Sequence, residues 1–437
     1  MDVTIQPRAL TGTVSAVPSK SEAHRALILA AFAQGPSTIS CPSTSADIEA
    51  TASCLRALGA QVEHDGECFR ITPLPRGNKG LPVARLGQVL DCGESGSTLR
   101  FLLPIVAAVD CDARLSGKGR LFERPLSPLY EQLVEHGAAL SPQGVAPLAV
   151  SGKIRGGVFS LPGNVSSQFV SGLLMAAGVT DLGIEVRVGE PVQSRPYIEI
   201  TSRMLKRFGI GVETWPRQSR HGNEMVWSVG PEQVPGSPGH VDIAGDWSNA
   251  AFWLCAGAIS GNGVTVSGLD LTSVQGDRAI MAILARMGAR VIRGRGSATV
   301  MPDRLVTCEI DVSDIPDLVP PLALVAACAK GTSRIHGAAR LRLKESDRIA
   351  TVTSALRALG VSVDEHEDGL DIHGRGMLAG GSVDAANDHR IAMMAAIAST
   401  RAEGPVVIHG AECVAKSYPA FFDDFAFLGG GLEGRDD

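Results

Sequence analysis

The sequence predicts an α/β or α+β protein built from six repeated units, each with one buried helix, one amphipathic helix and several strands. Two series of segments support this fold class. In the first, an amphipathic helix ends at a glycine and a strand follows; in the second, a polar start is followed by a helix that is apolar on all its faces. Both series recur in step about every 70 to 80 residues, which indicates internal repetition.

The first series is recognised by its glycine. LRALGAQV at 55–62 recurs as LVEHGAAL, LKRFGIGV, LARMGARV and LRALGVSV, with a weaker sixth copy, FAFLGGGL, at 425–432. This pattern is typical of a helix closed by a glycine in the left-handed conformation. The glycines are Gly59, Gly137, Gly209, Gly288, Gly360 and Gly429. Two copies continue into hairpin patterns with an Asp-Gly turn, VEHDGECFRI and VDEHEDGLDI.

The second series consists of apolar helices such as SGSTLRFLLPIVAAV and DHRIAMMAAIAS. Their expected polar starts are Ser21, Ser95, Ser166, Ser248, Asp317 and Asp388. A helix N-terminus has unpaired N–H groups and the positive end of the helix dipole, so it favours anions. Lys20 and Arg25 beside the first start strengthen this preference. If such helix starts share one site, the ligand carries several negative charges.

Six units suit two lobes of three. The segment 234–245, VPGSPGHVDIAG, is rich in proline and glycine and is a plausible crossing between the lobes. The chain would cross back near Pro18, which places the first strand in the second lobe. The predicted lobes are therefore 20–239 and 1–19 plus 240–437.

Composition excludes several classes of protein. The chain has 437 residues and a formal net charge of −6, without the basic excess of proteins that bind nucleic acids or membrane surfaces. No signal-peptide layout opens it and no uncharged apolar run reaches the length of a membrane span. Its nine cysteines show no CxxC spacing, which favours reduced thiols in a cytoplasmic protein over disulfides or a zinc site.

Three polar stretches have two interpretations each. Arg100 lies within an apolar run, so it is either buried against a partner or directed at a ligand. KESDR at 344–348 is either a solvated helix face or part of a site. SSQ at 166–168 is either a helix N-cap or a ligand-binding motif.

Taken in order, nine stretches resemble the 5-enolpyruvylshikimate-3-phosphate synthase family over essentially the whole chain. They are PSKSEAHRALILAA, ESGSTLRF, ERP, SSQF, SRPYIEIT, IPDL, LRLKESDRI, NDHRIAM and AKSYPAFF. The resemblance implies two lobes of three repeats, each an inside-out α/β barrel with buried parallel helices and outer sheets, and ligands in the cleft between lobes. It implies transfer of the enolpyruvyl group of phosphoenolpyruvate to the 5-hydroxyl of shikimate 3-phosphate, in the pathway to aromatic amino acids. It also implies that no metal and no organic cofactor are used, and we expect a monomer, although the sequence itself does not specify the oligomeric state.

The resemblance assigns roles to residues that match the family's motifs. Asp317 is the expected base, Glu345 the expected acid, and Lys20 the residue that contacts both substrates. The expected shikimate 3-phosphate ligands are Lys20, Ser21, Arg25, Ser166, Ser167, Gln168, Ser194, Tyr197, Asp317, Arg340 and Lys344. The expected phosphoenolpyruvate ligands are Lys20, Gly96, Arg124, Gln168, Arg348, Arg390 and Lys416. Gly96 would let the ligand approach the backbone because it lacks a side chain.

The sequence departs from the family pattern at two places, and two other functions are alternatives. Arg340 stands where many members have asparagine, and ESGSTLRF replaces the commoner glycine-loop forms, which leaves glyphosate sensitivity open. One alternative is the related enolpyruvyl transferase that acts on UDP-N-acetylglucosamine, but the loop DARLSGKGRLFERPLSP lacks its reactive cysteine, and Cys111 only precedes that loop. The other is a non-catalytic anion-binding scaffold, which would be expected to lack Lys20, Asp317 or Glu345.

Overall fold

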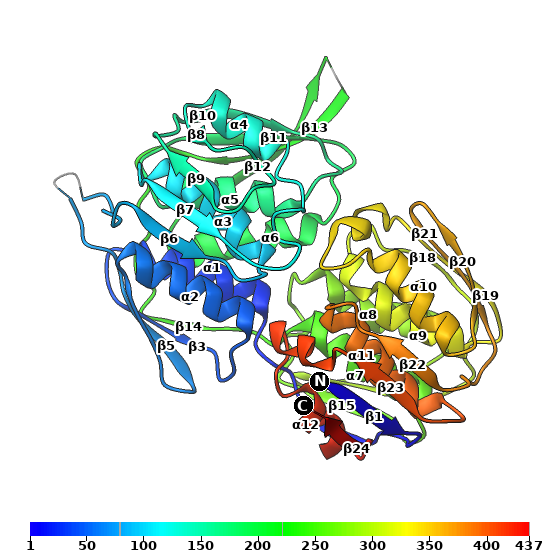
Figure 1. The fold of residues 1–437 in the computed structure, drawn as a ribbon. Coiled ribbons are helices and arrows are strands. Elements are labelled where there is room, and N and C mark those ends of the chain that lie inside the picture. Colours follow the sequence, from blue (N-terminus) through cyan, green and yellow to red (C-terminus); the bar gives the residue numbers. More distant parts are fainter. Residues whose placement is uncertain (78–79, 221, 437) are drawn as a thin grey trace. The chain divides into compact units, whose positions relative to one another are not determined.

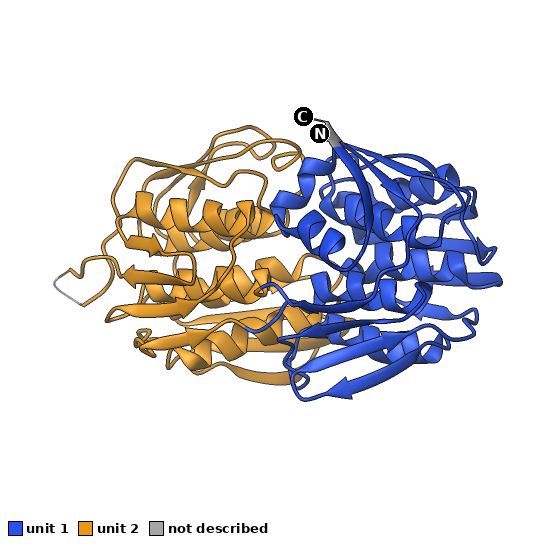
Figure 2. Cartoon of the chain, turned by 90° about the horizontal axis from the view of Figure 1, so that it is seen from below, with its two compact units in different colours: residues 1–17, 244–437 blue, residues 18–243 orange. Residues whose placement is uncertain are grey.

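The computed structural model of the protein describes residues 1–77, 80–220 and 222–436. The chain forms two compact units, unit 1 from 1–17 and 244–437 and unit 2 from 18–243 (Figure 2). The sequence predicted lobes that meet at 19/20 and 239/240. Unit 2 extends through residue 243 because β14 (His240–Asp242) pairs in parallel with β3 (Ser37–Ser40).

Each unit contains three four-stranded sheets of one design. The first two strands are parallel, and each later neighbour is antiparallel. In unit 2 the sheets are β14-β3-β5-β4, β6-β7-β9-β8 and β10-β11-β13-β12. The strands not yet bounded are β4 (Gln61–His64), β5 (Cys68–Thr72), β6 (Gln88–Asp91), β7 (Ala113–Ser116), β8 (Ala139–Leu140), β9 (Leu148–Ser151), β10 (Gly157–Leu161), β11 (Ile184–Gly189), β12 (Glu213–Ser219) and β13 (Gly222–Val229).

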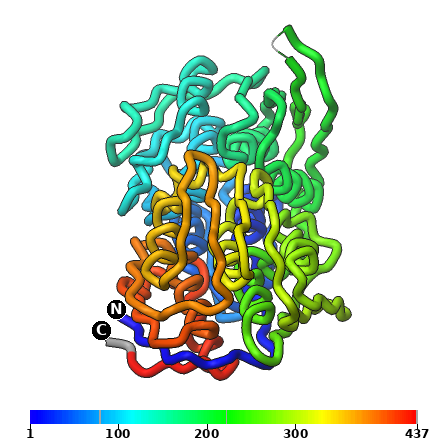
Figure 3. Tube along the Cα trace, turned by 90° about the vertical axis from the view of Figure 1, so that its right-hand side faces the viewer, coloured from blue at the N-terminus to red at the C-terminus, as the bar shows by residue number. Residues whose placement is uncertain are grey.

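Unit 1 repeats this design with strands from both ends of the chain. Its sheets are β2-β15-β17-β16, β18-β19-β21-β20 and β22-β23-β1-β24. β1 lies between β23 and β24, so the first and last strands are neighbours (Figure 3). The strands are β1 (Asp2–Gln6), β2 (Gly12–Ser15), β15 (Val264–Ser267), β16 (Arg290–Gly294), β17 (Ser297–Met301), β18 (Glu309–Asp311), β19 (Gly331–His336), β20 (Ser362–His366), β21 (Gly369–Gly374), β22 (Gly381–Asp384), β23 (Val406–His409) and β24 (Gly431–Asp436).

Buried and amphipathic helices alternate along the chain (Figure 1). The buried helices are α1 (Lys20–Ala31), α3 (Gly96–Ala108), α5 (Ser167–Gly178), α7 (Trp247–Ile259), α9 (Val319–Cys328) and α11 (His389–Ala398). The second helix of each repeat is α2 (Ala46–Leu58), α4 (Leu129–Glu135), α6 (Arg195–Arg207), α8 (Ile280–Arg286), α10 (Arg348–Ala358) or α12 (Phe421–Phe427). The predicted fold of two lobes, each with three repeats of inner helices and outer sheets, is confirmed.

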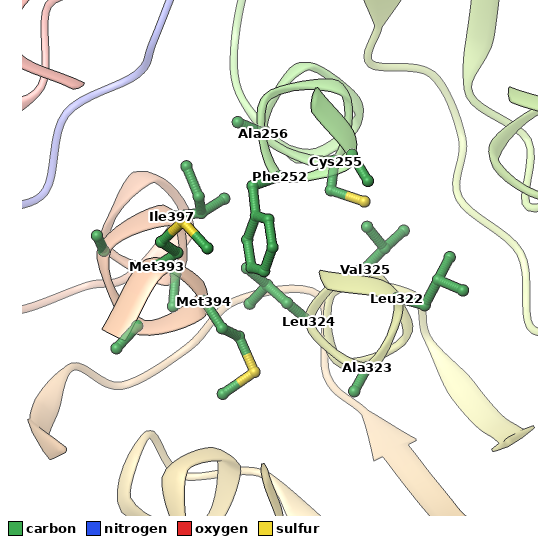
Figure 4. Close-up of a cluster of buried hydrophobic side chains, with 14 of the residues drawn as sticks. Phe252, Cys255, Ala256, Leu322, Ala323, Leu324, Val325, Met393, Met394 and Ile397 are labelled. Carbon is green, nitrogen blue, oxygen red and sulfur yellow. The ribbon is translucent and has the colours of Figure 1, made fainter. Parts of the chain in front are cut away.

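The core of unit 1 is centred on its three buried helices. α7, α9 and α11 pack against one another, and each also contacts its own sheet. Phe252 of α7 lies beside Leu324 of α9 and Met393 of α11, all three fully buried (Figure 4). Burying helices on all sides requires apolar residues on every face, which explains why the sequence shows continuous apolar runs there. No helix in the described ranges is long and apolar enough to cross a membrane.

Each of the six repeat glycines follows a helix and itself has a positive φ, as predicted. They are Gly59, Gly137, Gly209, Gly288, Gly360 and Gly429. Replacing two of them by alanine tests how tightly the repeat is packed. Gly288 and Gly429 have φ of +95° and +99°, and a Cβ would lie 2.3 Å from the carbonyl oxygen of Arg304 at Gly288 but no nearer than 3.8 Å to another atom at Gly429. At both positions the positive φ alone should lower the free energy of unfolding of an alanine variant by about 1–2 kcal/mol.

We therefore expect Gly288→Ala to lower the free energy of unfolding by about a further 1–3 kcal/mol relative to Gly429→Ala, because overpacking adds to the φ strain. Both glycines lie in unit 1, so chemical denaturation of the two variants compares like with like. Equal midpoints for the two variants would contradict the tight packing at Gly288.

Two of the predicted helix starts are wrong by two residues. The N-caps of α1 and α7 are Ser19 and Asp246, and Ser21 and Ser248 lie inside these helices. An N-cap needs an extended backbone with its side chain turned back to a free N–H, and Ser19 and Asp246 have that conformation.

The caps differ in charge between the units. Unit 2 caps its buried helices with the hydroxyls of Ser19, Ser95 and Ser166. Unit 1 uses the carboxylates of Asp246 and Asp388 for α7 and α11, and Asp317 lies in the 3₁₀ turn Pro316–Leu318 before α9. A carboxylate neutralises the positive helix end, so helix starts alone favour anions only in unit 2. In unit 1 that preference must come from cationic side chains.

Candidate active site

Arg348 organises a cluster of carboxylates in unit 1. It is the first residue of α10, its side chain is only 1% exposed, and it donates to three acids. Its Nη1 lies 2.9 Å from Asp317 Oδ1, its Nη2 2.7 Å from Glu345 Oε2, and its Nε 2.9 Å from Asp388 Oδ2. A guanidinium can donate to all three acids at once because its donors are arranged in a rigid fork.

Asp317 is surrounded by cations. Besides Arg348, it accepts a 3.0 Å hydrogen bond from Arg390 Nη2, and Lys344 Nζ lies 3.9 Å from its Oδ1. Burial by itself would raise the pKa of Asp317, but the charges of Arg390, Lys344 and Arg348 outweigh it and hold that pKa well below its usual range. Asp317 is therefore ionised at neutral pH.

Backbone geometry positions the third acid, Asp388. The two residues before it, Ala386 and Asn387, have φ of +49° and +54°, and Asp388 then caps α11 by accepting from the N–H of Arg390. Lys416 Nζ donates to the carbonyl of Asn387 at 2.7 Å, which ties the AKSYP motif to this turn. The turn thus brings Lys416 to the segment that carries Arg390.

Arg340 lies in the 3₁₀ segment Ala339–Leu343. Its Nη2 donates to the carbonyl of Ser313 at 2.9 Å. Arg340, which departs from the family pattern, therefore contacts the backbone of its own unit.

At the start of α1, the two basic residues have different surroundings. Lys20 Nζ pairs with Asp47 at 2.8 Å. Arg25 is 2% exposed, its guanidinium carbon lies 4.7 Å from the centre of the Phe101 ring, and its donors reach neutral oxygens. These belong to Thr201, Ser171 and the carbonyls of Ser21 and Tyr197, at 2.6–3.2 Å. Burial lowers the pKa of Arg25 to about 9.

The starts of α3 and α5 share a second polar group. Gln168 donates to Ser97 Oγ at 2.9 Å and accepts from Arg100 Nη1 at 2.9 Å. Arg100 also donates to the carbonyl of Pro125 and is buried, so the first interpretation of this residue is confirmed. Ser166 is the N-cap of α5, and Ser167 begins the helix.

Arg124 packs against Gly96. A Cβ on Gly96 would lie 2.9 Å from the guanidinium atoms of Arg124. The missing side chain thus admits an arginine in the structure, where the sequence predicted only close approach of a ligand. Arg124 itself, the middle residue of the ERP motif, is buried.

The SRPY motif marks the start of α6. Ser194 is buried with φ of +55°, and the Tyr197 carbonyl accepts from Arg25. The tyrosine is partly buried. Arg25 therefore links α1 to α5 through Ser171 and to α6 through Thr201.

The predicted residues are divided between the two units. Unit 1 holds Asp317, Lys344, Glu345, Arg348 and Arg390, joined by direct contacts, with Lys416 on the neighbouring turn. Unit 2 holds Lys20, Ser21, Arg25, Gly96, Arg124, Ser166, Ser167, Gln168, Ser194 and Tyr197. The solvated-face interpretation of KESDR is wrong, because Glu345 contacts the buried Arg348 and the segment is a turn before α10.

Sequence reasoning missed several supporting residues. Asp388 was predicted only as a helix start, although its place in the NDHR motif beside Arg390 was a signal for the site. Asp47, Ser171 and Thr201 hold Lys20 and Arg25, and no local motif marks them.

Two further observations bear on the chemistry. Cys111 is 1% exposed, and burial raises the pKa of its thiol to about 11, which makes it a poor nucleophile. In the described part of the chain, no group of three His, Cys, Asp or Glu side chains is arranged to hold a metal ion.

Known proteins with similar sequences point to the same family as the motifs of this site. The family model described as EPSP synthase (3-phosphoshikimate 1-carboxyvinyltransferase) matches residues 5–425. The chain is 41% identical to the 3-phosphoshikimate 1-carboxyvinyltransferase of Clostridium kluyveri, covering 99% of this chain and 98% of the relative. It is 40% identical to that of Clostridium acetobutylicum, covering 98% and 97%. The chain belongs to the EPSP synthase family.

The solved structures of this family share the fold. The EPSP synthase of Acinetobacter baumannii superimposes with a TM-score of 0.80 at 29% identity, and the match covers 99% of each chain. As a member of the EPSP synthase family, the chain is a transferase of the shikimate pathway. Family membership and the buried thiol of Cys111 both speak against the UDP-sugar alternative.

Proposed function

We propose that this chain transfers the enolpyruvyl group of phosphoenolpyruvate to the 5-hydroxyl of shikimate 3-phosphate, releases phosphate and needs no cofactor. The single observation that supports it best is the cluster around Arg348, where the carboxyl groups of Asp317 and Glu345 share one buried guanidinium. Two carboxylates in contact with the same cation suit a reaction that removes one proton and adds another. A plain anion-binding scaffold has no need of them.

The binding roles are those that the resemblance to the family's motifs implies, and the charges of the substrates agree with them. Phosphoenolpyruvate carries a phosphate and a carboxylate, and the proposed ligands are Lys20, Gly96, Arg124, Gln168, Arg348, Arg390 and Lys416. Shikimate 3-phosphate is assigned to Lys20, Ser21, Arg25, Ser166, Ser167, Gln168, Ser194, Tyr197, Asp317, Arg340 and Lys344. Hydroxyl-capped helix starts in unit 2 support this assignment, because they leave the positive helix ends unneutralised.

The reaction proceeds by addition and elimination. The 5-hydroxyl oxygen bonds to C2 of phosphoenolpyruvate, its proton passes to Asp317, and C3 receives a proton from Glu345. Glu345, now a carboxylate, then takes a proton back from C3 as the bond between C2 and the phosphate oxygen breaks, which restores the carbon–carbon double bond. The proton held by Asp317 leaves with the phosphate. Asp317 and Glu345 must act in opposite senses, so their proton affinities have to differ when substrate is bound.

Substrate binding supplies a way to change those affinities. Asp317 is a weak base while Arg348 and Arg390 are engaged with it, because their charges hold its pKa low. Phosphoenolpyruvate competes for the same two guanidinium groups. Once they turn toward its anionic oxygens, Asp317 loses part of their attraction and becomes a better base.

The function is tested by phosphate release from the purified protein. Phosphate should appear only when both substrates are present, and a chelator should leave the rate unchanged. Turnover with UDP-N-acetylglucosamine in place of shikimate 3-phosphate would refute the proposal, as would tight binding of both substrates without any phosphate release.

Gly96→Ala tests the packing of Arg124. The new methyl group displaces the guanidinium that now lies against Gly96. Since misplacing a ligand-positioning group by about 1 Å costs on the order of 100-fold, we expect kcat/KM for phosphoenolpyruvate to fall about 10- to 100-fold. The control is the same substitution in an Arg124→Ala background, where it should have little additional effect. Additive losses would show that Gly96 acts independently of Arg124.

A further inference from the structure

A buried chain of side-chain hydrogen bonds joins the N-terminal halves of three helices in unit 2. His24 Nδ1 of α1 lies 2.7 Å from Thr51 Oγ1 of α2, and that oxygen lies 2.6 Å from Thr98 Oγ1 of α3. Thr98 Oγ1 donates in turn to the cap residue Ser95 at 2.8 Å. All four side chains are buried, with exposed fractions of 0–1%.

The protons available at each group indicate which group donates at each step of this series of hydrogen bonds. Either hydroxyl can donate between Thr51 and Thr98, but only donation from Thr51 leaves the single hydroxyl proton of Thr98 for Ser95 Oγ or, at 3.5 Å, the carbonyl of Asp47. In that arrangement Thr51 accepts from His24, and every bond of the series is made. It requires His24 to carry its proton on Nδ1.

The surroundings of the ring agree with this tautomer. His24 Nε2 has no hydrogen-bond partner among the described residues, and a bare ring nitrogen is cheaper to bury than an unpaired N–H. Burial first, and then the charges of Lys20 and Arg25, lower the pKa of His24 well below its usual value, so the ring is neutral. The imidazole also lies edge-on to Phe101, 6.3 Å between ring centres.

Stability alone does not account for the arrangement. Apolar side chains would fill the same space without burying an unpaired nitrogen. What the network does provide is a fixed distance between α1 and α3. Lys20 lies one turn before His24, and Gly96 follows Ser95 directly.

We propose that His24 and Thr51 are positioning residues for phosphoenolpyruvate, which hold the start of α1 with Lys20 against the start of α3 with Gly96 through one ordered hydrogen-bond chain. This inference rests on the proposed function, because Lys20 and Gly96 are assigned to phosphoenolpyruvate there. Neither positioning residue touches the substrate. They act on the spacing of the groups that do.

The tautomer is measured by nuclear magnetic resonance of protein labelled with ¹⁵N in its ten histidines. The His24 signals are identified as those lost in His24→Asn. We expect a neutral ring protonated at Nδ1 at every pH at which the protein is folded. A ring protonated at Nε2, or one that titrates near neutral pH, would overturn the proposal.

Kinetics test the positioning role with two matched pairs of variants. Thr51→Val keeps the shape of threonine but breaks the chain, whereas Thr51→Ser keeps the hydroxyl. His24→Leu removes the donor, whereas the amide of His24→Asn reaches the place of Nδ1. Because small misplacements cost up to about 100-fold, we expect Thr51→Val and His24→Leu to raise KM for phosphoenolpyruvate about tenfold, with smaller changes in kcat and in KM for shikimate 3-phosphate.

In the serine and asparagine variants, KM for phosphoenolpyruvate should stay within about threefold of its value in the unsubstituted protein. Loss of one interaction, by comparison, changes it about tenfold. Turnover with unchanged KM for phosphoenolpyruvate in Thr51→Val would overturn this inference alone. Equal rises for both substrates in all four variants would do so as well, because they would indicate general loosening of unit 2. Absence of turnover in the unsubstituted protein would overturn the proposed function and this inference with it.

Discussion

Asp317→Asn is expected to lower turnover by about 100- to 10,000-fold, the usual loss when a positioned acid or base is removed. Asparagine keeps the shape of the side chain and one acceptor oxygen, so it can still accept from one of Arg348 and Arg390, which now donate to different carboxylate oxygens. It cannot take up a proton from the 5-hydroxyl. Steady-state phosphate release with both substrates at saturation gives the measurement.

The matched control is Asp364→Asn, the same substitution in the same unit. Asp364 is 63% exposed and pairs with His373 on the surface of β20 and β21. Its replacement should leave turnover unchanged. If Asp317→Asn also keeps turnover within a few-fold of the unsubstituted protein, Asp317 is not the base. Glu345→Gln should show a loss of similar size if Glu345 is the acid.

Arg348→Met is expected to destabilise unit 1 by about 3–5 kcal/mol at neutral pH, in addition to abolishing activity. The methionine fills the space of the arginine stem but leaves Asp317, Glu345 and Asp388 without the cation that all three contact. Chemical denaturation at a series of pH values measures the loss. Arg348→Lys, which keeps the charge but not the fork, should lose less.

The pH dependence of this loss has a definite sign. In the unsubstituted protein the pKa of Asp317 is depressed, so its stabilisation is present above the unfolded-state value of about 3.9 and is lost as pH falls through the folded-state value. In Arg348→Met the carboxylates repel one another, and protonation relieves the repulsion. The difference in stability between the two proteins should therefore shrink as pH falls from 7 toward about 4. A difference that stays constant with pH would show that packing, not charge, sets the effect.

The repeat was predictable because its signals are local. A glycine after an amphipathic helix reports the backbone conformation at that residue, and all six predicted glycines have positive φ. Helix caps were less certain, since PSKSE offers two serines within three residues and only the folded backbone decides between Ser19 and Ser21. The same ambiguity explains Ser248, where Asp246 takes the cap.

The site was predictable where one motif carries several of its members. KESDR contains Lys344, Glu345 and Arg348, and the structure joins the last two directly. Partners from distant segments could not be found this way. Arg25 reaches Ser171 and Thr201, which are 146 and 176 residues away, and no pattern near Arg25 specifies them. Nor does sequence reveal that Arg124 lies against Gly96, because the contact depends on the path of the ERP turn.

The pairing of β1 with β23 and β24 has a consequence for how the protein is made. A ribosome synthesises β1 before the rest of unit 1, but the two strands that pair with β1 lie within residues 406–436 and emerge much later. Unit 2 is one continuous stretch, 18–243, and can fold during translation once its last strand is outside the ribosome. Unit 1 can close only after residues 406–436 have been made. β1 is thus made long before the strands on either side of it, and nascent chains halted before residue 406 should contain a folded unit 2 and an incomplete unit 1.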